Sequence, residues 1–107
     1  MKLDADFPYL QDMYNDSYYP PFLVDKVKEQ IQKMVQFLES GSFSNEVIQD
    51  ELDKMTIAIN DLEEEFDGHD SEIETVARDS IGTTVEAILH VFKVEIDIET
   101  AIREREW

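Results

Sequence analysis

Apolar residues recur in the middle of this chain at spacings of four, three, four, three and four. They are Ile48, Leu52, Met55, Ile59, Leu62 and Phe66. This unbroken pattern places them on one stripe of a helix, which must be buried against other helices. Ser44 is placed to cap the helix, Phe43 and Ile48 to form a hydrophobic staple across the cap, and Gly68 to end the helix. The pattern predicts a long helix that belongs to a bundle.

Two further segments carry helical stripes. Apolar residues between positions 24 and 38 predict a helix from about Pro21 to Ser40, ended by a glycine at position 41. A later stripe, between positions 73 and 96, begins at a capping box formed by Ser71 and Glu74. Gly82 interrupts this stripe, so the last helix is expected to be long and kinked near Gly82.

The two ends of the chain are less regular. Residues 6–16 predict a short first helix capped by Asp6, which the prolines at positions 20 and 21 then terminate. Residues 93–99 alternate between apolar and charged types, a pattern that also fits a half-buried strand. No other segment alternates in this way and could pair with it, so we predict helix for residues 93–99. The alternative is a strand that pairs with its own copy in a homodimer.

These expectations define a single all-α domain over residues 1–107, a compact bundle of about four helices. The chain has 107 residues, of which 42% are hydrophobic, and this suffices for one core without metals or disulfides. It contains no cysteine, which fits a reducing compartment. The first residues lack the apolar run of a signal peptide, and no stretch is long enough to span a membrane. The expected location is cytoplasmic.

Charge limits the classes of partner. The chain has 26 acidic and 9 basic residues, giving a formal charge of −17. Nucleic acids and anionic membrane surfaces would be repelled, whereas a basic protein surface would be attracted. The expected partner is therefore a basic protein, with no nucleic acid and no membrane. The sequence has no phosphate loop, nucleophile elbow or HExxH motif, so we expect no enzymatic activity, no catalytic residues and no cofactor.

The segment from position 63 to position 74 is the candidate metal site. It carries acidic residues around Gly68, and on an EF-hand template Glu63, Glu65, Asp67 and Glu74 occupy ligand positions. The template prefers the shorter aspartate at the position of Glu63. The same residues are also explained as a helix end, a glycine stop and a capping box. No metal site is favoured, and these four carboxylates remain the alternative.

Aromatic residues concentrate near the N-terminus. Six of them, Phe7, Tyr9, Tyr14, Tyr18, Tyr19 and Phe22, lie within sixteen residues and surround the two prolines. Tyrosines held by prolines make good interface anchors, because each buries a large area at little entropic cost. The alternative is that these rings cover one end of the bundle. We predict a partner-binding site at Asp16, Tyr18, Tyr19 and Pro20.

The segment from Asp16 to Lys26 includes Tyr-Tyr-Pro-Pro and Leu-Val-Asp-Lys. It resembles the N-terminal signature of a family of small bacterial proteins of unknown function. That resemblance implies no activity. A narrower likeness links Asp16, Tyr18, Tyr19 and Pro20 to acidic immunity proteins of nuclease bacteriocins, which use a tyrosine pair against a basic toxin. In those proteins the motif follows two helices, whereas here it follows one.

The leading interpretation is a non-enzymatic module that binds a basic protein through an acidic and aromatic surface. Its sharper form is an inhibitor or immunity protein for a basic enzyme. The alternative is a divalent-metal-binding protein that uses the acidic segment from position 63 to 74.

Overall fold

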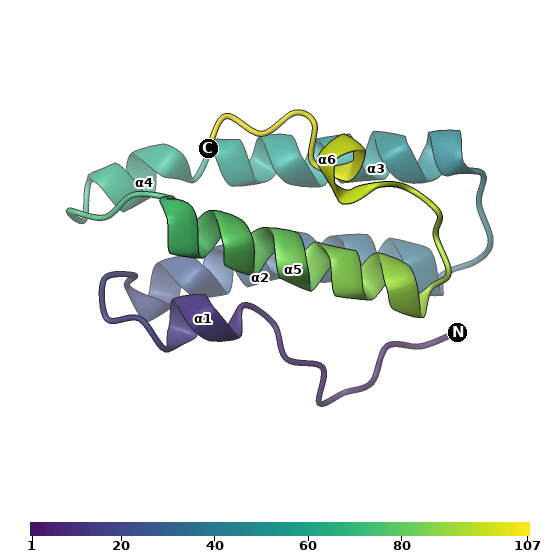
Figure 1. Ribbon diagram of the computed structural model, residues 1–107, viewed down its shortest axis with the longest axis horizontal. Coiled ribbons are helices and arrows are strands. Elements are labelled where there is room, and N and C mark those ends of the chain that lie inside the picture. The colour runs from purple at the N-terminus through teal and green to yellow at the C-terminus, as the bar shows by residue number, and fades with distance from the viewer.

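A computed structural model describes all residues 1–107 as six helices without strands (Figure 1). The helices are α1 (Gln11–Tyr14), α2 (Pro21–Glu39), α3 (Asn45–Asn60), α4 (Glu63–Asp67), α5 (Thr75–Val91) and α6 (Ile98–Ala101). The predicted all-α class is confirmed. No helix is long and apolar enough to cross a lipid bilayer.

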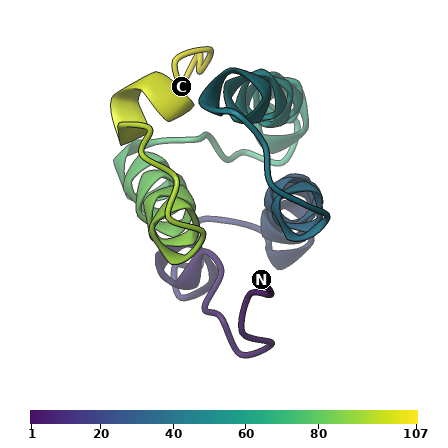
Figure 2. The same cartoon turned by 90° about the vertical axis from the view of Figure 1, so that its right-hand side faces the viewer.

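Three long helices, α2, α3 and α5, form the body of the bundle and run along its longest axis (Figure 1). The short helix α1 packs on α5, and α6 contacts both α3 and α5. Seen end-on, α6 closes the gap between those two long helices (Figure 2). Where about four helices were expected, the bundle consists of three long helices, α2, α3 and α5, against which the short helices α1 and α6 pack.

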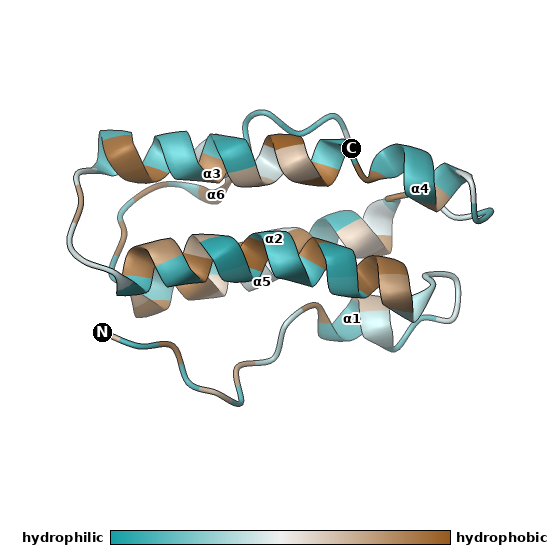
Figure 3. Ribbon diagram, turned by 180° about the vertical axis from the view of Figure 1, so that it is seen from behind, coloured by the Kyte–Doolittle hydropathy of each residue, from teal (hydrophilic) through white to brown (hydrophobic).

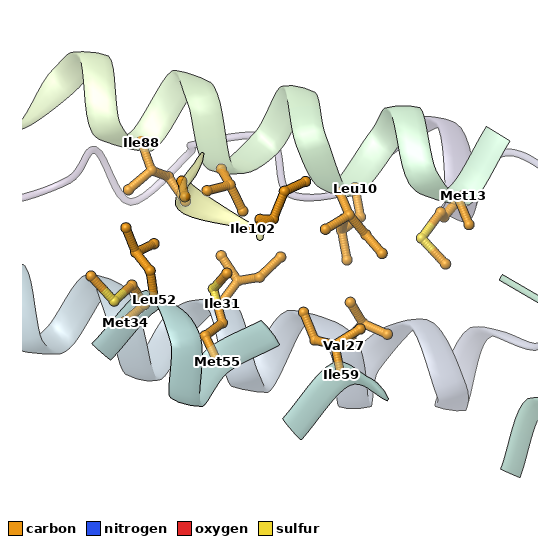
Figure 4. Packing of buried hydrophobic residues seen from close by; sticks show 14 of the residues in the cluster. Leu10, Met13, Val27, Ile31, Met34, Leu52, Met55, Ile59, Ile88 and Ile102 are labelled. Atoms are coloured by element: carbon orange, nitrogen blue, oxygen red, sulfur yellow. The ribbon is translucent and has the colours of Figure 1, made fainter. Parts of the chain in front are cut away.

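One hydrophobic cluster of 23 buried residues holds these helices together. Side chains from α2 and α3 meet side chains from α1, α5 and α6 across it, as Figure 4 shows for Ile31, Leu52, Ile88 and Ile102. Each fully buried aliphatic side chain stabilises the fold by about 1.5–3 kcal/mol relative to exposure. Figure 3 shows the corresponding alternation of apolar and polar residues along the helix surfaces.

The prediction of a helix over residues 6–16 is wrong for its first half, because α1 begins only at Gln11. Leu10 has a φ of 52°, in the left-handed region, which no regular α-helix can continue through. Its side chain is fully buried, and its N–H donates to Thr84 Oγ1 on α5 at 3.2 Å. The burial of Leu10 against α5 therefore decides the backbone here, and Asp6 caps no helix.

The start of α3 agrees with the sequence. Ser44 is the N-cap, and its hydroxyl accepts a hydrogen bond from Val47 N at 3.3 Å. The ring of Phe43 stacks on Phe37 of α2, with centroids 4.2 Å apart.

The end of α3 differs from the prediction, because the helix stops at Asn60 and α4 follows as a separate short helix. The Asn60 side chain is engaged with the C-terminal segment: its Nδ2 donates to Glu104 O at 2.8 Å, and its Oδ1 accepts from Glu106 N at 3.0 Å. The chain turns at this point, and Phe66 still reaches the core.

Two features expected of the last long helix are wrong. Ser71 is not its cap, because the Ser71 hydroxyl donates to Tyr18 O at 3.0 Å and α5 begins at Thr75. The N-cap position is instead Glu74, whose side chain makes no capping hydrogen bond. The kink expected near Gly82 does not interrupt α5, which is one continuous helix from Thr75 to Val91 (Figure 1).

The helix predicted over residues 93–99 is also wrong in most of its length. The chain is irregular from 92 to 97, and α6 begins only at Ile98, capped by the Asp97 carboxylate. Lys93 adopts a φ of 57°, and Val94 N donates to Leu89 O at 2.9 Å, which closes the end of α5. The apolar residues that suggested a strand pack on the core of the same chain, at Val94, Ile96 and Ile98.

Candidate functional site

Two loops meet at one end of the bundle and carry the residues of the predicted partner-binding site. The loop between α1 and α2 holds residues 15–20, and the loop between α4 and α5 holds residues 68–74. Both lie at the left end of the molecule in Figure 1, beside the start of α5. The hydrogen bond from Ser71 to Tyr18 O joins them. Residues 61–74 contain eight acidic residues and no lysine or arginine, so this end is strongly negative.

Tyr19 is an internal residue of this site, with 3% of its surface exposed. Its hydroxyl accepts a hydrogen bond from Ala77 N in the first turn of α5, at 3.2 Å. Its ring packs edge-on against Phe66, with centroids 6.5 Å apart. Burial raises the pKa of its phenol. Tyr19 therefore anchors the loop and offers little surface to a partner.

Tyr18, in contrast, lies at the surface with 40% exposure. Its ring packs edge-on against Tyr19, with centroids 5.0 Å apart. The Asp16 carboxylate accepts a hydrogen bond from Tyr18 N at 2.9 Å and so fixes the turn. Desolvation and the charges of Glu74 and Glu72 raise the pKa of the Tyr18 phenol. The ring is thus held in place beside two carboxylates.

The other two predicted residues have supporting roles. Asp16 is half-buried, and Pro20 is the half-buried N-cap position of α2. The next proline, Pro21, occupies the first turn of that helix, where its missing N–H costs nothing.

Phe22 belongs to this surface although the predicted site left it out. It is 48% exposed, and its ring packs edge-on against the His69 imidazole with centroids 5.0 Å apart. The signal was present in the aromatic cluster of the sequence, but periodicity could not show whether Phe22 or Tyr19 faced outward.

An acidic hollow adjoins the exposed rings. Asp12, Asp16 and Asp79 line it together with the exposed side chain of Val76, and its volume is about 510 Å³. The three carboxylates come from α1, the loop after it, and α5. Tyr18, Phe22 and Val76 are the exposed large apolar side chains contributed by the loop before α2, the start of α2 and the first turn of α5. We call these three residues with Asp12, Asp16 and Asp79 the acidic–aromatic end.

The structure does not assemble the alternative metal site from Glu63, Glu65, Asp67 and Glu74. No group of three or more histidine or carboxylate side chains is placed to hold a metal ion. Glu65 instead pairs with Lys26 of α2, with the Nζ and Oε1 atoms 2.6 Å apart. The first three residues belong to a short helix, α4, which spreads their side chains instead of wrapping them around one point.

Residues 3–107 match the model of a family of unknown function, DUF5713. The chain belongs to that family. The resemblance to a family of unknown function is thus confirmed over nearly the whole chain, and the DUF5713 family supplies no activity to assign to these residues. No curated protein and no solved structure matches the chain.

Proposed function

We propose that this DUF5713 protein is a non-enzymatic module that binds a basic protein partner at its acidic–aromatic end. The observation that carries the proposal is the position of Tyr18 and Phe22, two rings that are 40% and 48% exposed in the most acidic part of a chain of charge −17. An exposed aromatic side chain can bury a large area at small entropic cost, so it serves as an anchor.

The two rings are presented in a fixed arrangement. The Phe22 ring packs edge-on against His69. The Tyr18 backbone is hydrogen-bonded to the side chains of Ser71 and Asp16. The Phe22 ring and the Tyr18 backbone are therefore both held by the loop between α4 and α5, so less conformational entropy remains to be lost on binding. The carboxylates around them would accelerate the approach of a basic protein and fix its orientation.

The sharper form of the proposal is inhibition of a basic enzyme, as an immunity protein does. A binding surface of this kind would cover the positively charged substrate-binding region of an enzyme that acts on an anionic substrate. The net charge of the chain supports this version, since the same negative potential that steers the partner in would exclude the anionic substrate.

A pull-down that compares three forms of the protein tests the proposal. The wild type, a Tyr18→Ser/Phe22→Ser variant and a Val47→Ser/Ile57→Ser variant are each immobilised and exposed to host lysate in about 0.05 M and about 0.5 M salt. Val47 and Ile57 are 42% and 46% exposed on α3, so the last variant is a matched control for the loss of exposed apolar surface.

We expect one basic protein in stoichiometric amount on the wild type and on the control variant, released by high salt and absent from the Tyr18/Phe22 variant. Circular dichroism confirms that each variant is folded. Equal retention of the protein by the Tyr18/Phe22 variant would refute this surface, and retention that ignores salt would refute the electrostatic part.

A further inference from the structure

The largest cleft of the molecule lies beside the acidic–aromatic end and has a volume of about 740 Å³. It is bounded by α4, by the segment leading into α5, and by Glu106 and Trp107. Its wall carries six carboxylates, those of Glu63, Glu64, Asp67, Glu72, Glu74 and Glu106. Arg78 is its one basic residue, so the cleft is strongly negative.

Trp107 distinguishes this cleft from a merely acidic surface. It is the one tryptophan of the chain, and it lines both this cleft and the adjoining one along α5. Its indole Nε1 is buried and has no hydrogen-bond partner. The face of a tryptophan ring is also the best aromatic surface for an organic cation.

The distribution of the carboxylates favours an extended occupant over a metal ion. No three of them converge on one point in the way that a metal site built from carboxylates requires. Glu63 and Glu106 line the cleft together, and burial and the charge of Glu106 raise the pKa of Glu63. A peptide segment that carries basic side chains can pair with such separated carboxylates one at a time.

We propose that this cleft receives a lysine- or arginine-bearing peptide segment of the partner, with Trp107 contacting the cationic side chain. The inference rests on the proposed function and names the chemistry that the partner inserts. Glu72 and Glu74 connect the two regions, because they line the cleft and also lie close enough to the Tyr18 phenol to raise its pKa. Cleft and aromatic rings are therefore parts of one continuous surface.

The fluorescence of Trp107 provides a direct test, since no other tryptophan contributes. The probe is a capped hexa-arginine peptide, titrated at low salt into the wild type, a Glu63→Gln/Glu106→Gln variant and a Glu29→Gln/Glu95→Gln variant. Glu29 on α2 and Glu95 in the loop after α5 are exposed and lie outside the cleft. The two double variants have the same net charge, so they separate local pairing from overall attraction.

We expect a saturable change in Trp107 emission with the peptide, weakened about tenfold in the Glu63/Glu106 variant and by much less in the Glu29/Glu95 variant. In a Trp107→Leu variant, calorimetry should record a weakening of about threefold. Equal weakening in the two glutamine variants would overturn the inference, as would peptide binding without any change in emission. The same emission change with Ca²⁺ or Mg²⁺ alone would also overturn it.

The inference and the proposed function fail separately. If the partner captured by the Tyr18/Phe22 experiment binds the Glu63/Glu106 and Glu29/Glu95 variants equally, the cleft is not its docking site, although the proposed function stands. If no partner depends on Tyr18 and Phe22, the proposed function fails whatever the peptide does.

Discussion

Replacement of Gly82 by alanine should stabilise this protein. Gly82 lies in the middle of α5, which is regular on both sides of it. A Cβ atom added at this position would meet no atom within 4 Å. In a helix interior, glycine is about 1 kcal/mol less favourable than alanine, because it loses more backbone freedom on folding. With no clash to offset this gain, we expect Gly82→Ala to raise the free energy of unfolding by about 0.5–1 kcal/mol.

The shift is measurable for a chain of this size. For a domain of roughly 100 residues, 1 kcal/mol corresponds to about 4–8 °C in melting temperature. We therefore expect an increase of about 2–8 °C, followed by far-UV circular dichroism. Urea unfolding should show a higher midpoint with an unchanged slope, because the surface exposed on unfolding is the same.

Gly82→Pro is the matched control, since proline removes a helix hydrogen bond and should cost about 3 kcal/mol or more. A Gly82→Ala variant that is no more stable than the wild type, or less stable, would refute the reasoning. It would mean that α5 is bent at Gly82 in solution, as the interrupted sequence stripe predicts.

Three further changes have defined outcomes. Lys93→Gly should raise the free energy of unfolding by up to about 1 kcal/mol, because Lys93 has a φ of 57° and glycine adopts that conformation without strain. Urea unfolding measures this change, and an unchanged urea midpoint would contradict it. Desolvation, the hydrogen bond to Asp25 and the charge of Asp25 raise the pKa of Tyr14 in the folded protein. The unfolded chain therefore ionises first as the pH rises. The contribution of Tyr14 to the free energy of unfolding should be fully present below about pH 10 and should be lost above it. Tyr14→Phe should flatten that decline in melting temperature, and an equally steep decline in the variant counts against the assignment. Added salt should raise the melting temperature by screening repulsion among the carboxylates, and a melting temperature that stays constant up to about 0.3 M salt would show that they are already compensated.

The candidate site shows how far sequence reasoning could reach. Aromatic clustering and acidity indicated the end of the molecule where Tyr18 and Phe22 are exposed, because composition is visible in the chain itself. The sequence could not show which of the two adjacent tyrosines is exposed. Tyr19 is turned inward by its contacts with Ala77 and Phe66, which lie far along the chain. Ser71 illustrates the same limit, because the local pattern predicted a cap, whereas α5 begins at Thr75 and the Ser71 hydroxyl donates to the distant carbonyl of Tyr18.

The sequence by itself determined the all-α class, the bounds of α2 and the capped start of α3, because periodicity and capping act within a few residues. It also set the strong negative charge on which the proposed function depends. The tertiary structure alone decided where α3 ends, how Leu10 bends the chain, and that α6 seals the gap between α3 and α5. Each of these depends on contacts between distant residues, such as Asn60 with the backbone of Glu106 or Leu10 with Thr84. Distant contacts outweigh local preference there because burial and satisfied hydrogen bonds contribute more free energy than a favourable helical residue does.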